Sequence, residues 1–140
     1  MSNDVTFVHL TDLHIGDHKT DDHLFSDTAQ TLREIMAQVA TIEPKPSFIV
    51  ASGDLANAGD AESYVLLREI MAQTELPVIY AIGNHDTREG FYAGMEIDTD
   101  APDAPFYHDR IVEGIHVITL DSSTPGFIGG TIEEEQFEWL

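Results

Sequence analysis

The stretch VIYAIGNHD (residues 78–86) places a glycine, an amide, an imidazole and a carboxylate directly after an apolar run. The run is short and contains β-branched residues, which is typical of a buried strand. The same arrangement occurs twice upstream, where TDLH (11–14) and SGDL (52–55) each follow an apolar run. Each predicted strand therefore ends in polar side chains that have no ordinary place in an apolar core.

Predicted strands and helices alternate along the part of the chain that contains these three polar segments. Short apolar runs predict strands at residues 5–10, 48–51 and 78–82. Between them, apolar side chains recur at helical spacing within residues 24–42 and 61–74, and prolines follow both segments. The order strand-helix-strand-helix-strand predicts an α/β fold with a parallel sheet and right-handed crossovers.

The remainder of the chain has a different character. Residues 90–105 are rich in Asp, Gly and Pro, and we expect them to form a loop. Residues 106–111 and 115–120 have the pattern of two strands joined in a hairpin, and a helix is expected to begin near residue 132. The length of 140 residues suits a single domain, 1–140, with one core.

Composition narrows the functional classes. The chain has 26 acidic residues against 6 Lys and Arg, a formal net charge of −20, so a nucleic-acid partner is not expected. An acidic protein that handles an anionic substrate needs cations to offset its own field, and bound metal ions are one source. The chain has no cysteine, which excludes disulfides, thiolate catalysis and cysteine-based zinc sites.

The sequence also bears on location. The amino-terminal residues have neither the basic segment nor the apolar segment of a signal peptide. No apolar run approaches the roughly 18 residues that a membrane span requires. We therefore expect a soluble, cytoplasmic protein without a membrane partner.

The carboxyl ends of parallel strands meet at one edge of a sheet, where α/β folds bind their ligands. We expect that edge to gather six polar residues: Asp12, His14, Asp54, Asn84, His85 and Asp86. Their oxygen and nitrogen atoms, without sulfur, suit Mn, Fe, Zn or Co. Asp12 and His14 are two positions apart, so in an extended segment they point to the same face and form a pair for one ion. Asp54 has two oxygens and can bridge to a second ion, to which Asn84 offers a neutral oxygen.

Each of these residues also has a purely structural interpretation. An aspartate at a strand end commonly caps a turn or a helix, and a lone histidine is commonly part of the folded framework. Gly53 and Gly83 can supply a positive φ at the turn after a strand. His9 is expected in the core or behind the site, and His18 and His23 either line the entrance or are solvated. Three strand ends that all carry such groups favour a site over independent structural roles.

Three segments, DLH (12–14), GDLANAG (53–59) and GNHD (83–86), resemble the first three motifs of the calcineurin-like metallophosphoesterase superfamily in order and spacing. The stretch LDSSTPGFIGGTIEEEQFEWL (120–140) resembles the branch that holds the bacterial cyclic-nucleotide phosphodiesterases and glycerophosphodiesterases. The resemblance covers the whole chain and implies hydrolysis of a small phosphodiester substrate. The implied fold is the amino-terminal half of a four-layer α/β/β/α sandwich.

The resemblance also implies a centre of two divalent or mixed-valence metal ions. Asp12 and His14 would hold the first ion, and Asp54 would bridge both ions. Asn84 would bind the second ion. Together the ions would activate a shared water whose hydroxide attacks phosphorus in line.

Two further residues have catalytic roles by the same resemblance. His85 would face the phosphate and assist the leaving oxygen. Asp86 would hydrogen-bond His85 and fix its orientation.

The chain departs from the family pattern in its later histidines. The family has three more histidine ligands, but no G-H-x-H motif occurs here and no histidine follows His116. We therefore expect an incomplete amino-terminal part that is inactive by itself and that associates into homo-oligomers through its uncovered sheet. The alternatives are a non-catalytic metal-binding protein, a DNA exonuclease and a phosphomonoesterase.

Overall fold

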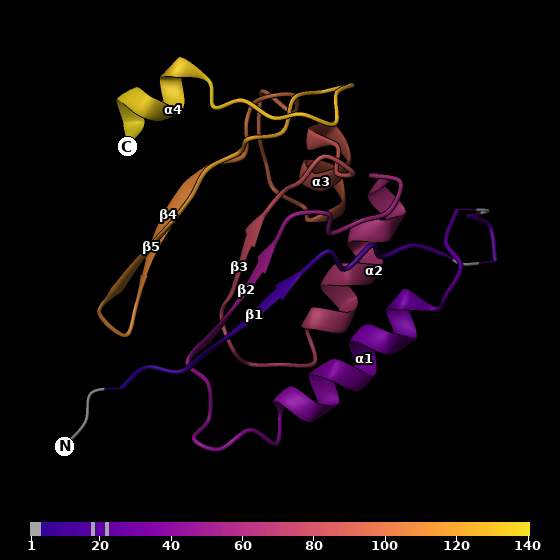
Figure 1. Ribbon diagram of the computed structural model, residues 1–140, viewed down its shortest axis with the longest axis vertical. Coiled ribbons are helices and arrows are strands. Elements are labelled where there is room, and N and C mark those ends of the chain that lie inside the picture. Colours follow the sequence, from indigo (N-terminus) through magenta and orange to yellow (C-terminus); the bar gives the residue numbers. More distant parts are fainter. Residues whose placement is uncertain (1–3, 18, 22) are drawn as a thin grey trace.

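A parallel three-stranded sheet lies at the centre of the computed structural model, which describes residues 4–17, 19–21 and 23–140 (Figure 1). Its strands, in spatial order, are β1 (Phe7–Thr11), β2 (Phe48–Ser52) and β3 (Val78–Ala81). Both neighbouring pairs are parallel, so the carboxyl ends of all three strands lie at the same edge. The predicted α/β architecture with a parallel sheet is confirmed.

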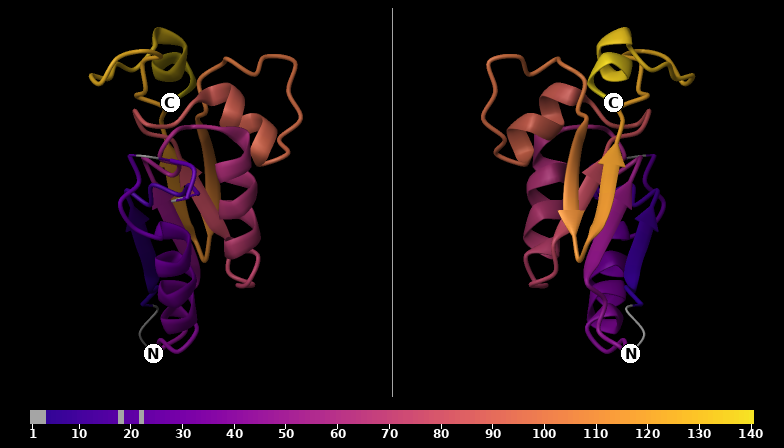
Figure 2. Two further views of the ribbon diagram at one scale, coloured as in Figure 1. Left: turned by 90° about the vertical axis from the view of Figure 1, so that its right-hand side faces the viewer. Right: turned by 90° about the vertical axis from the view of Figure 1, so that its left-hand side faces the viewer.

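Two helices, α1 (Thr28–Val39) and α2 (Ala61–Met71), cover one face of this sheet (Figures 1 and 2). Each helix begins after an aspartate whose side chain accepts a hydrogen bond from a backbone N–H of the first turn, Asp27 for α1 and Asp60 for α2. Alternate strand residues pack against the apolar faces of the helices. This core includes Leu32, Met36, Ile49, Ala51, Tyr64, Leu67 and Ile70.

A short helix, α3 (Arg88–Gly94), begins just before the segment that the sequence predicts as a loop and occupies its first part. The hydroxyl of Thr87 caps this helix by accepting a hydrogen bond from Gly90 N at 3.1 Å. Its glycines allow close packing instead of breaking the helix: a Cβ at Gly94 would lie 2.4 Å from the backbone oxygen of Ala61. The loop prediction is wrong here because glycine serves the contact between α3 and α2.

The strands β4 (His108–Val112) and β5 (Ile115–Thr119) form an antiparallel hairpin, as the sequence predicts. Glu113 and Gly114 both have positive φ, 50° and 80°, which suits a tight two-residue turn. The hairpin is a separate sheet on the side of β3 away from α1 and α2 (Figure 2). It contacts β3 through His108, whose Nε2 lies 2.8 Å from the backbone oxygen of Tyr80.

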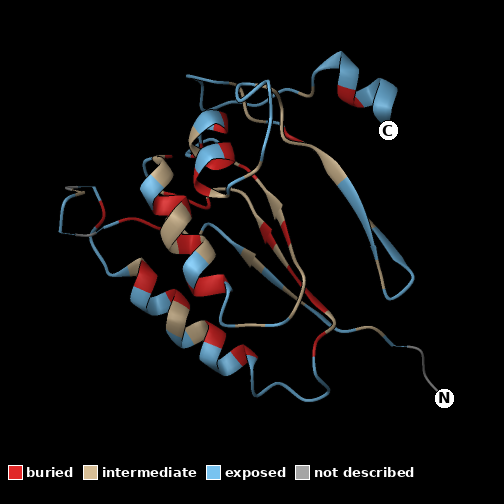
Figure 3. Cartoon of the chain, turned by 180° about the vertical axis from the view of Figure 1, so that it is seen from behind, coloured by how far each residue is buried: buried red, intermediate tan, exposed pale blue. Residues whose placement is uncertain are grey.

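The last helix, α4 (Glu134–Trp139), begins two residues later than expected. Only Gln136 of this helix is buried, and its side-chain amide bonds both the N–H and the C=O of Asp121. Figure 3 shows that the hairpin and α4 are exposed over most of their length. Among the described residues, none of the helices combines the length and the apolar character that a bilayer crossing requires.

Candidate metal centre

The segments that follow β1 and β2 run side by side beyond the strands themselves. Asp12 N donates a hydrogen bond to the backbone oxygen of Gly53 at 3.1 Å. His14 N donates to the backbone oxygen of Asp54 at 2.9 Å. Gly53 N in turn donates to the backbone oxygen of Ala81 in β3 at 2.8 Å. These bonds hold the polar tips of the three strands in a fixed register.

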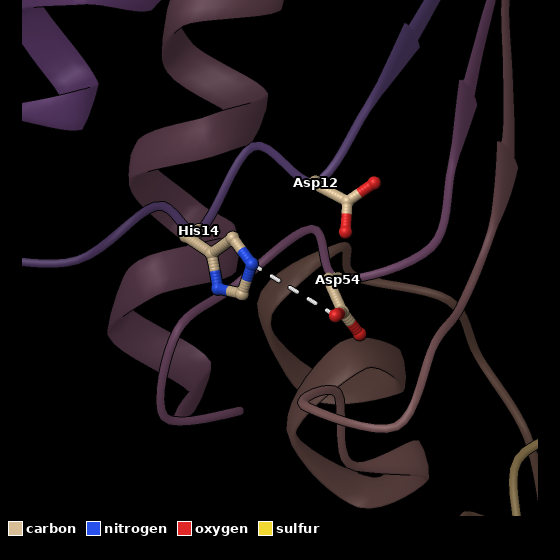
Figure 4. A group of neighbouring side chains, drawn as sticks. All are labelled: Asp12, His14 and Asp54. Atoms are coloured by element: carbon tan, nitrogen blue, oxygen red, sulfur yellow. Dashed lines mark ion pairs between the residues drawn. The ribbon is translucent and has the colours of Figure 1, made fainter.

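Three of the predicted ligands have an unusual backbone conformation. The φ angles of Asp12, His14 and Asp54 are 53°, 45° and 50°, in the left-handed region that non-glycine residues seldom occupy. The expectation that Asp12 and His14 lie in an extended segment is therefore wrong. Their side chains nevertheless converge: one ligand atom from each of the three residues lies within 4.8 Å of the others (Figure 4).

The geometry of this group fits a divalent cation. His14 Nε2 lies 3.8 Å from Asp54 Oδ2, and the Thr11 hydroxyl donates to Asp12 Oδ2 at 2.5 Å. Ligand atoms that share one ion at about 2.0–2.2 Å lie up to about 4.4 Å apart, so small side-chain rotations bring all three onto it. Two carboxylates beside an imidazole also make the site negative, which favours a cation.

The glycines of the two motifs have different tasks. Gly53 has a φ of +75°, as predicted for the turn after β2. Gly83 has no positive φ; instead, a Cβ there would lie 2.4 Å from both the backbone nitrogen and Oδ1 of Asp54. Gly83 is therefore required for close approach of the loop after β3 to Asp54.

Asn84 and His85 follow Gly83 and are exposed. His85 N donates to Asp54 Oδ1 at 3.0 Å, and the His85 ring lies edge-on to the His14 ring with centroids 4.7 Å apart. Both Asn84 and His85 line a cavity of about 510 Å³ whose other wall includes Ser123 to Gly126. The structure thus brings His85 to the side of the Asp12, His14 and Asp54 group and opens it towards a space that can hold a small molecule.

Asp86 does not orient His85 as expected. Its carboxylate is buried and accepts bonds from the N–H groups of Leu55, Ala56 and Gly83 and from the Tyr64 hydroxyl, at 2.7 to 3.1 Å. Burial raises the pKa of Asp86, while the bonds from Ala56, Gly83, Tyr64 and Leu55 oppose the rise. The side chain of Asp86 thus joins the loops after β2 and β3 from beneath the site. The prediction failed because a carboxylate with four donors around it has no reason to turn towards an exposed imidazole.

The imidazole of His85 has Asn57 as its hydrogen-bond partner. The backbone oxygen of Asn57 lies 2.9 Å from His85 Nδ1, and its side-chain Oδ1 lies 3.1 Å from His14 Nδ1. The sequence places Asn57 in a loop after Asp54 but gives no sign of these contacts. The only available signal is its position inside the GDLANAG segment.

A second polar cluster, centred on Arg88, is also absent from the sequence predictions. Arg88 Nε donates to Asp121 Oδ2 at 2.9 Å, and Nη2 donates to the backbone oxygen of Ser123 and to Glu133 Oε1. The side chains of Arg88 and Asp121 are 8% and 0% exposed. This cluster ties α3 to the segment between β5 and α4, and so fixes one wall of the cavity beside His85.

Two described histidines near the motifs, His9 and His23, are not part of the Asp12, His14 and Asp54 group. His9 is exposed on the sheet, with Nε2 2.6 Å from Ser52 Oγ, so its expected place in the core is wrong. His23 lines a separate cavity of about 720 Å³ beside the start of α2. His18 lies outside the described residues.

The fold and the site define a class: an α/β protein with a candidate cation site at the carboxyl edge of a parallel sheet. The chain matches the calcineurin-like phosphoesterase family over residues 5–137. It therefore belongs to this family, as the three motifs predicted. Members of the family use divalent metal ions.

Several curated bacterial proteins resemble the chain. It is 34% identical to a probable cyclic nucleotide phosphodiesterase of Rhodococcus erythropolis, with 95% of this chain and 45% of the relative aligned. It is 33% identical to the 3′,5′-cyclic adenosine monophosphate phosphodiesterase of Pseudomonas aeruginosa, over 97% of this chain and 48% of the relative. A probable glycerophosphodiester phosphodiesterase of Arcobacter nitrofigilis is 28% identical, over 81% of this chain and 42% of the relative. The chain spans about half the length of these curated relatives.

Proposed function

We propose that the chain contributes the first part of the active site of a metal-dependent phosphodiesterase whose substrates are cyclic nucleotides or glycerophosphodiesters. The convergence of Asp12, His14 and Asp54, with the ring of His85 beside them, carries this proposal. The names of its relatives, which describe cyclic nucleotide and glycerophosphodiester phosphodiesterases, support this substrate class.

The proposed ligands divide between two sites for Mn, Fe, Zn or Co. Asp12, His14 and Asp54 would hold one ion, and Asp54 and Asn84 would together hold a second ion. Bound ions of this kind neutralise phosphoryl oxygens and supply hydroxide near neutral pH. Because the proposed second ion would have only two ligands from the described residues, Asp54 and Asn84, we expect the 140-residue chain by itself to be inactive.

His85 is proposed to act on the leaving oxygen. Its Nδ1 faces the backbone oxygen of Asn57, which can only accept, so this nitrogen carries a proton and Nε2 remains for the substrate. From Nε2, the protonated ring can donate a hydrogen bond to the leaving alkoxide.

The charge balance favours metal ions over arginine side chains as the anchor for a phosphate. The chain has only 6 Lys and Arg residues. Arg88 lines the cavity beside His85, but its guanidinium donates to Asp121, Ser123, Glu133 and Asp103. The substrate phosphate is therefore expected to depend on the cations for charge neutralisation.

The test is a chimera in which this chain replaces the matching part of the Pseudomonas aeruginosa relative, assayed with Mn²⁺. We expect hydrolysis of bis-p-nitrophenyl phosphate and of cyclic AMP or a glycerophosphodiester, and loss of that activity in the Asp54→Ala chimera. Preferred cleavage of a phosphomonoester or of single-stranded DNA would reassign the substrate class. A folded, metal-loaded chimera that cleaves none of these would favour a non-catalytic binding role.

The same chimera tests the role of His85. His85→Ala should leave the metal content unchanged and lower kcat by about 10²–10⁴-fold, most strongly for substrates with poor leaving groups, since those need protonation most. Loss of metal together with activity would make His85 a ligand instead.

A further inference from the structure

Asn57 is bonded to both imidazoles of the site and to a carboxylate behind them. Its side-chain Oδ1 lies 3.1 Å from His14 Nδ1, and its Nδ2 donates to Asp21 Oδ2 at 2.7 Å. Its backbone oxygen lies 2.9 Å from His85 Nδ1. Asn57 therefore contacts Nδ1 of both histidines: its side chain contacts His14, and its backbone contacts His85.

The carboxylate of Asp21 fixes which way the amide of Asn57 faces. A carboxylate only accepts hydrogen bonds, so the NH₂ group of the amide must point to it. The opposite orientation would place Oδ1 against Asp21 Oδ2, two acceptors in contact. The bond from Asn57 holds the pKa of Asp21 below its usual value, and the carboxylate therefore stays ionised.

The orientation of the amide in turn fixes the tautomer of His14. Because Oδ1 of Asn57 can only accept, His14 Nδ1 must carry the proton that joins them. The other ring nitrogen, Nε2, then keeps its lone pair on the side of Asp54 Oδ2, 3.8 Å away. A neutral imidazole in water prefers the proton on Nε2, so without this contact the nitrogen that faces the cation site would be the protonated one.

The backbone of Asn57 is held independently of its side chain. Asn57 N donates to the backbone oxygen of Ile15 at 2.9 Å, as part of the ladder between the segments after β1 and β2. The backbone oxygen that faces His85 Nδ1 therefore keeps its place when the side chain changes. This separation allows the two contacts to be tested one at a time.

We propose that Asn57 is a positioning residue that sets the tautomers of both histidines, with Asp21 as the anchor of its amide. Its side chain keeps the Nε2 lone pair of His14 available for a metal ion, and its backbone keeps Nε2 of His85 free for the substrate. This proposal rests on the proposed metal and catalytic roles of His14 and His85. Partners of this kind behind a ligand typically change metal affinity by about 10–100-fold.

The first test needs no substitution. Long-range ¹H–¹⁵N spectra of the metal-free chain, recorded at about pH 9 where an ordinary histidine is neutral, report which ring nitrogen carries the proton. We expect both His14 and His85 to carry it on Nδ1. A proton on Nε2 of His14 in the unsubstituted chain would overturn the proposal.

The second test separates the two contacts. In Asn57→Ala, His14 should change towards the Nε2–H tautomer, whereas His85 should keep its proton on Nδ1 because the backbone oxygen remains. Calorimetry should show Zn²⁺ affinity reduced by about 10–100-fold. A purely structural role would disturb both rings together, and that result, like an unchanged His14 tautomer or Zn²⁺ affinity, would contradict the proposal.

Asp21→Asn is the matched control, because it keeps an acceptor for Asn57 Nδ2 but removes the charge that orients the amide. It should give a mixture of His14 tautomers and a smaller loss of Zn²⁺ affinity than Asn57→Ala. Unchanged spectra would show that Asp21 does not orient the amide of Asn57, and would overturn the proposal that Asp21 is its anchor. The tautomers are measured without substrate, so a chimera that fails to cleave phosphodiesters contradicts the proposed function and leaves the role of Asn57 standing.

Discussion

At the scale of single residues, the site is built from backbone conformations that cost free energy. Asp12, His14 and Asp54 all have positive φ, a state that costs about 1 kcal/mol or more for a residue with a Cβ. Aspartate and histidine occupy this region more often than most residues with a Cβ, but the conformation is still uncommon for them. Strain that coincides with three converging ligand atoms supports the view that their positions serve a function.

Asp54 is the residue on which the proposed metal binding depends most. Because Asp54 is proposed to serve both ions, Asp54→Ala should reduce the affinity for Mn²⁺ or Zn²⁺ more than Asn84→Ala does, which removes a proposed ligand of the second ion alone. Calorimetric titration of the 140-residue chain checks this order. Equal affinities for the unsubstituted chain and Asp54→Ala would rule out the assignment.

Asp86 should matter for stability. Asp86→Asn keeps one acceptor oxygen but places an NH₂ group against N–H donors of the surrounding loops, so the free energy of unfolding should fall by about 2–4 kcal/mol. Urea unfolding measures the change. Tyr64→Phe removes one of the four donors and should cost less, about 1–2 kcal/mol. If Asp86→Asn unfolds like the unsubstituted chain, the carboxylate does not join the loops as described.

Residue identities at the site could be predicted, but their contacts could not. Asp12, His14 and Asp54 were found because each follows a strand, and parallel strands end at one edge. The hydrogen-bond partners of Asp86 are mostly backbone N–H groups, and these cannot be identified from residue types in a sequence. The contact of Asn57 with His85 was not predicted for the same reason, since it is made by the backbone oxygen of Asn57.

At the scale of elements, periodic apolar residues predicted the parallel strands, the two long helices and the hairpin. The helix α3 was missed because it is short and contains two glycines, which alone suggest a loop. Tertiary packing requires glycine in this helix, because a Cβ at Gly90 would lie 2.1 Å from the backbone oxygen of Gly59. Contacts between elements that are distant in the chain cannot be inferred from local composition.

The packing of α3 against α2 predicts an unusual effect of alanine. In an exposed helix, Gly→Ala gains about 1 kcal/mol, but a Cβ at Gly94 would lie 2.4 Å from Ala61 O and 2.5 Å from Tyr64 Cβ. Gly94→Ala should therefore destabilise the fold by about 1–3 kcal/mol. Gly129→Ala is the control, since nothing lies within 4 Å of a Cβ there. A stability of Gly94→Ala at or above that of the control would show that α3 does not pack this closely.

The ion pair between Arg68 of α2 and Glu96, just after α3, predicts a dependence on pH. Arg68 lowers the pKa of Glu96 from its ordinary 4.5, so the contribution to stability is present above that value and is lost as the pH falls through the lower folded pKa. The thermal midpoints of the unsubstituted chain and Arg68→Met should therefore differ at pH 7 and converge as the pH falls below the ordinary value of 4.5. Glu96→Gln should show the same convergence. A constant difference down to pH 3 would assign the effect of Arg68 to packing alone.

At the scale of the whole molecule, large apolar side chains remain exposed on the edge strand β1 and on the hairpin of β4 and β5. Phe7 on the edge strand β1 is 49% exposed and stacks on Phe48, while Ile111 of the hairpin is 70% exposed. An edge strand with such a residue offers unpaired backbone groups and apolar area to a second chain. This surface supports the proposal that the 140-residue chain associates into homo-oligomers.

Sedimentation velocity over a range of concentrations tests this association. We expect a concentration-dependent dimer or larger species, and a shift towards monomer in Phe7→Lys, because a charge on β1 opposes edge pairing. Phe25→Lys is the matched control: Phe25 is 95% exposed but lies in the loop before α1. A monomer at every concentration, or equal effects of both substitutions, would contradict the proposal.

Backbone hydrogen bonds continue past β1 and β2 and bring together segments that are distant in the chain. A metal ion bound at this edge would link these segments. His14 and its partner Asn57 are 43 residues apart, and unfolding of either segment disperses the ligands. An ion that binds only the folded edge adds its binding free energy to that edge, about 2.7 kcal/mol at a free concentration of 100 times Kd. Metal supply would then govern how long the chain persists against proteases as well as whether its chemistry can proceed.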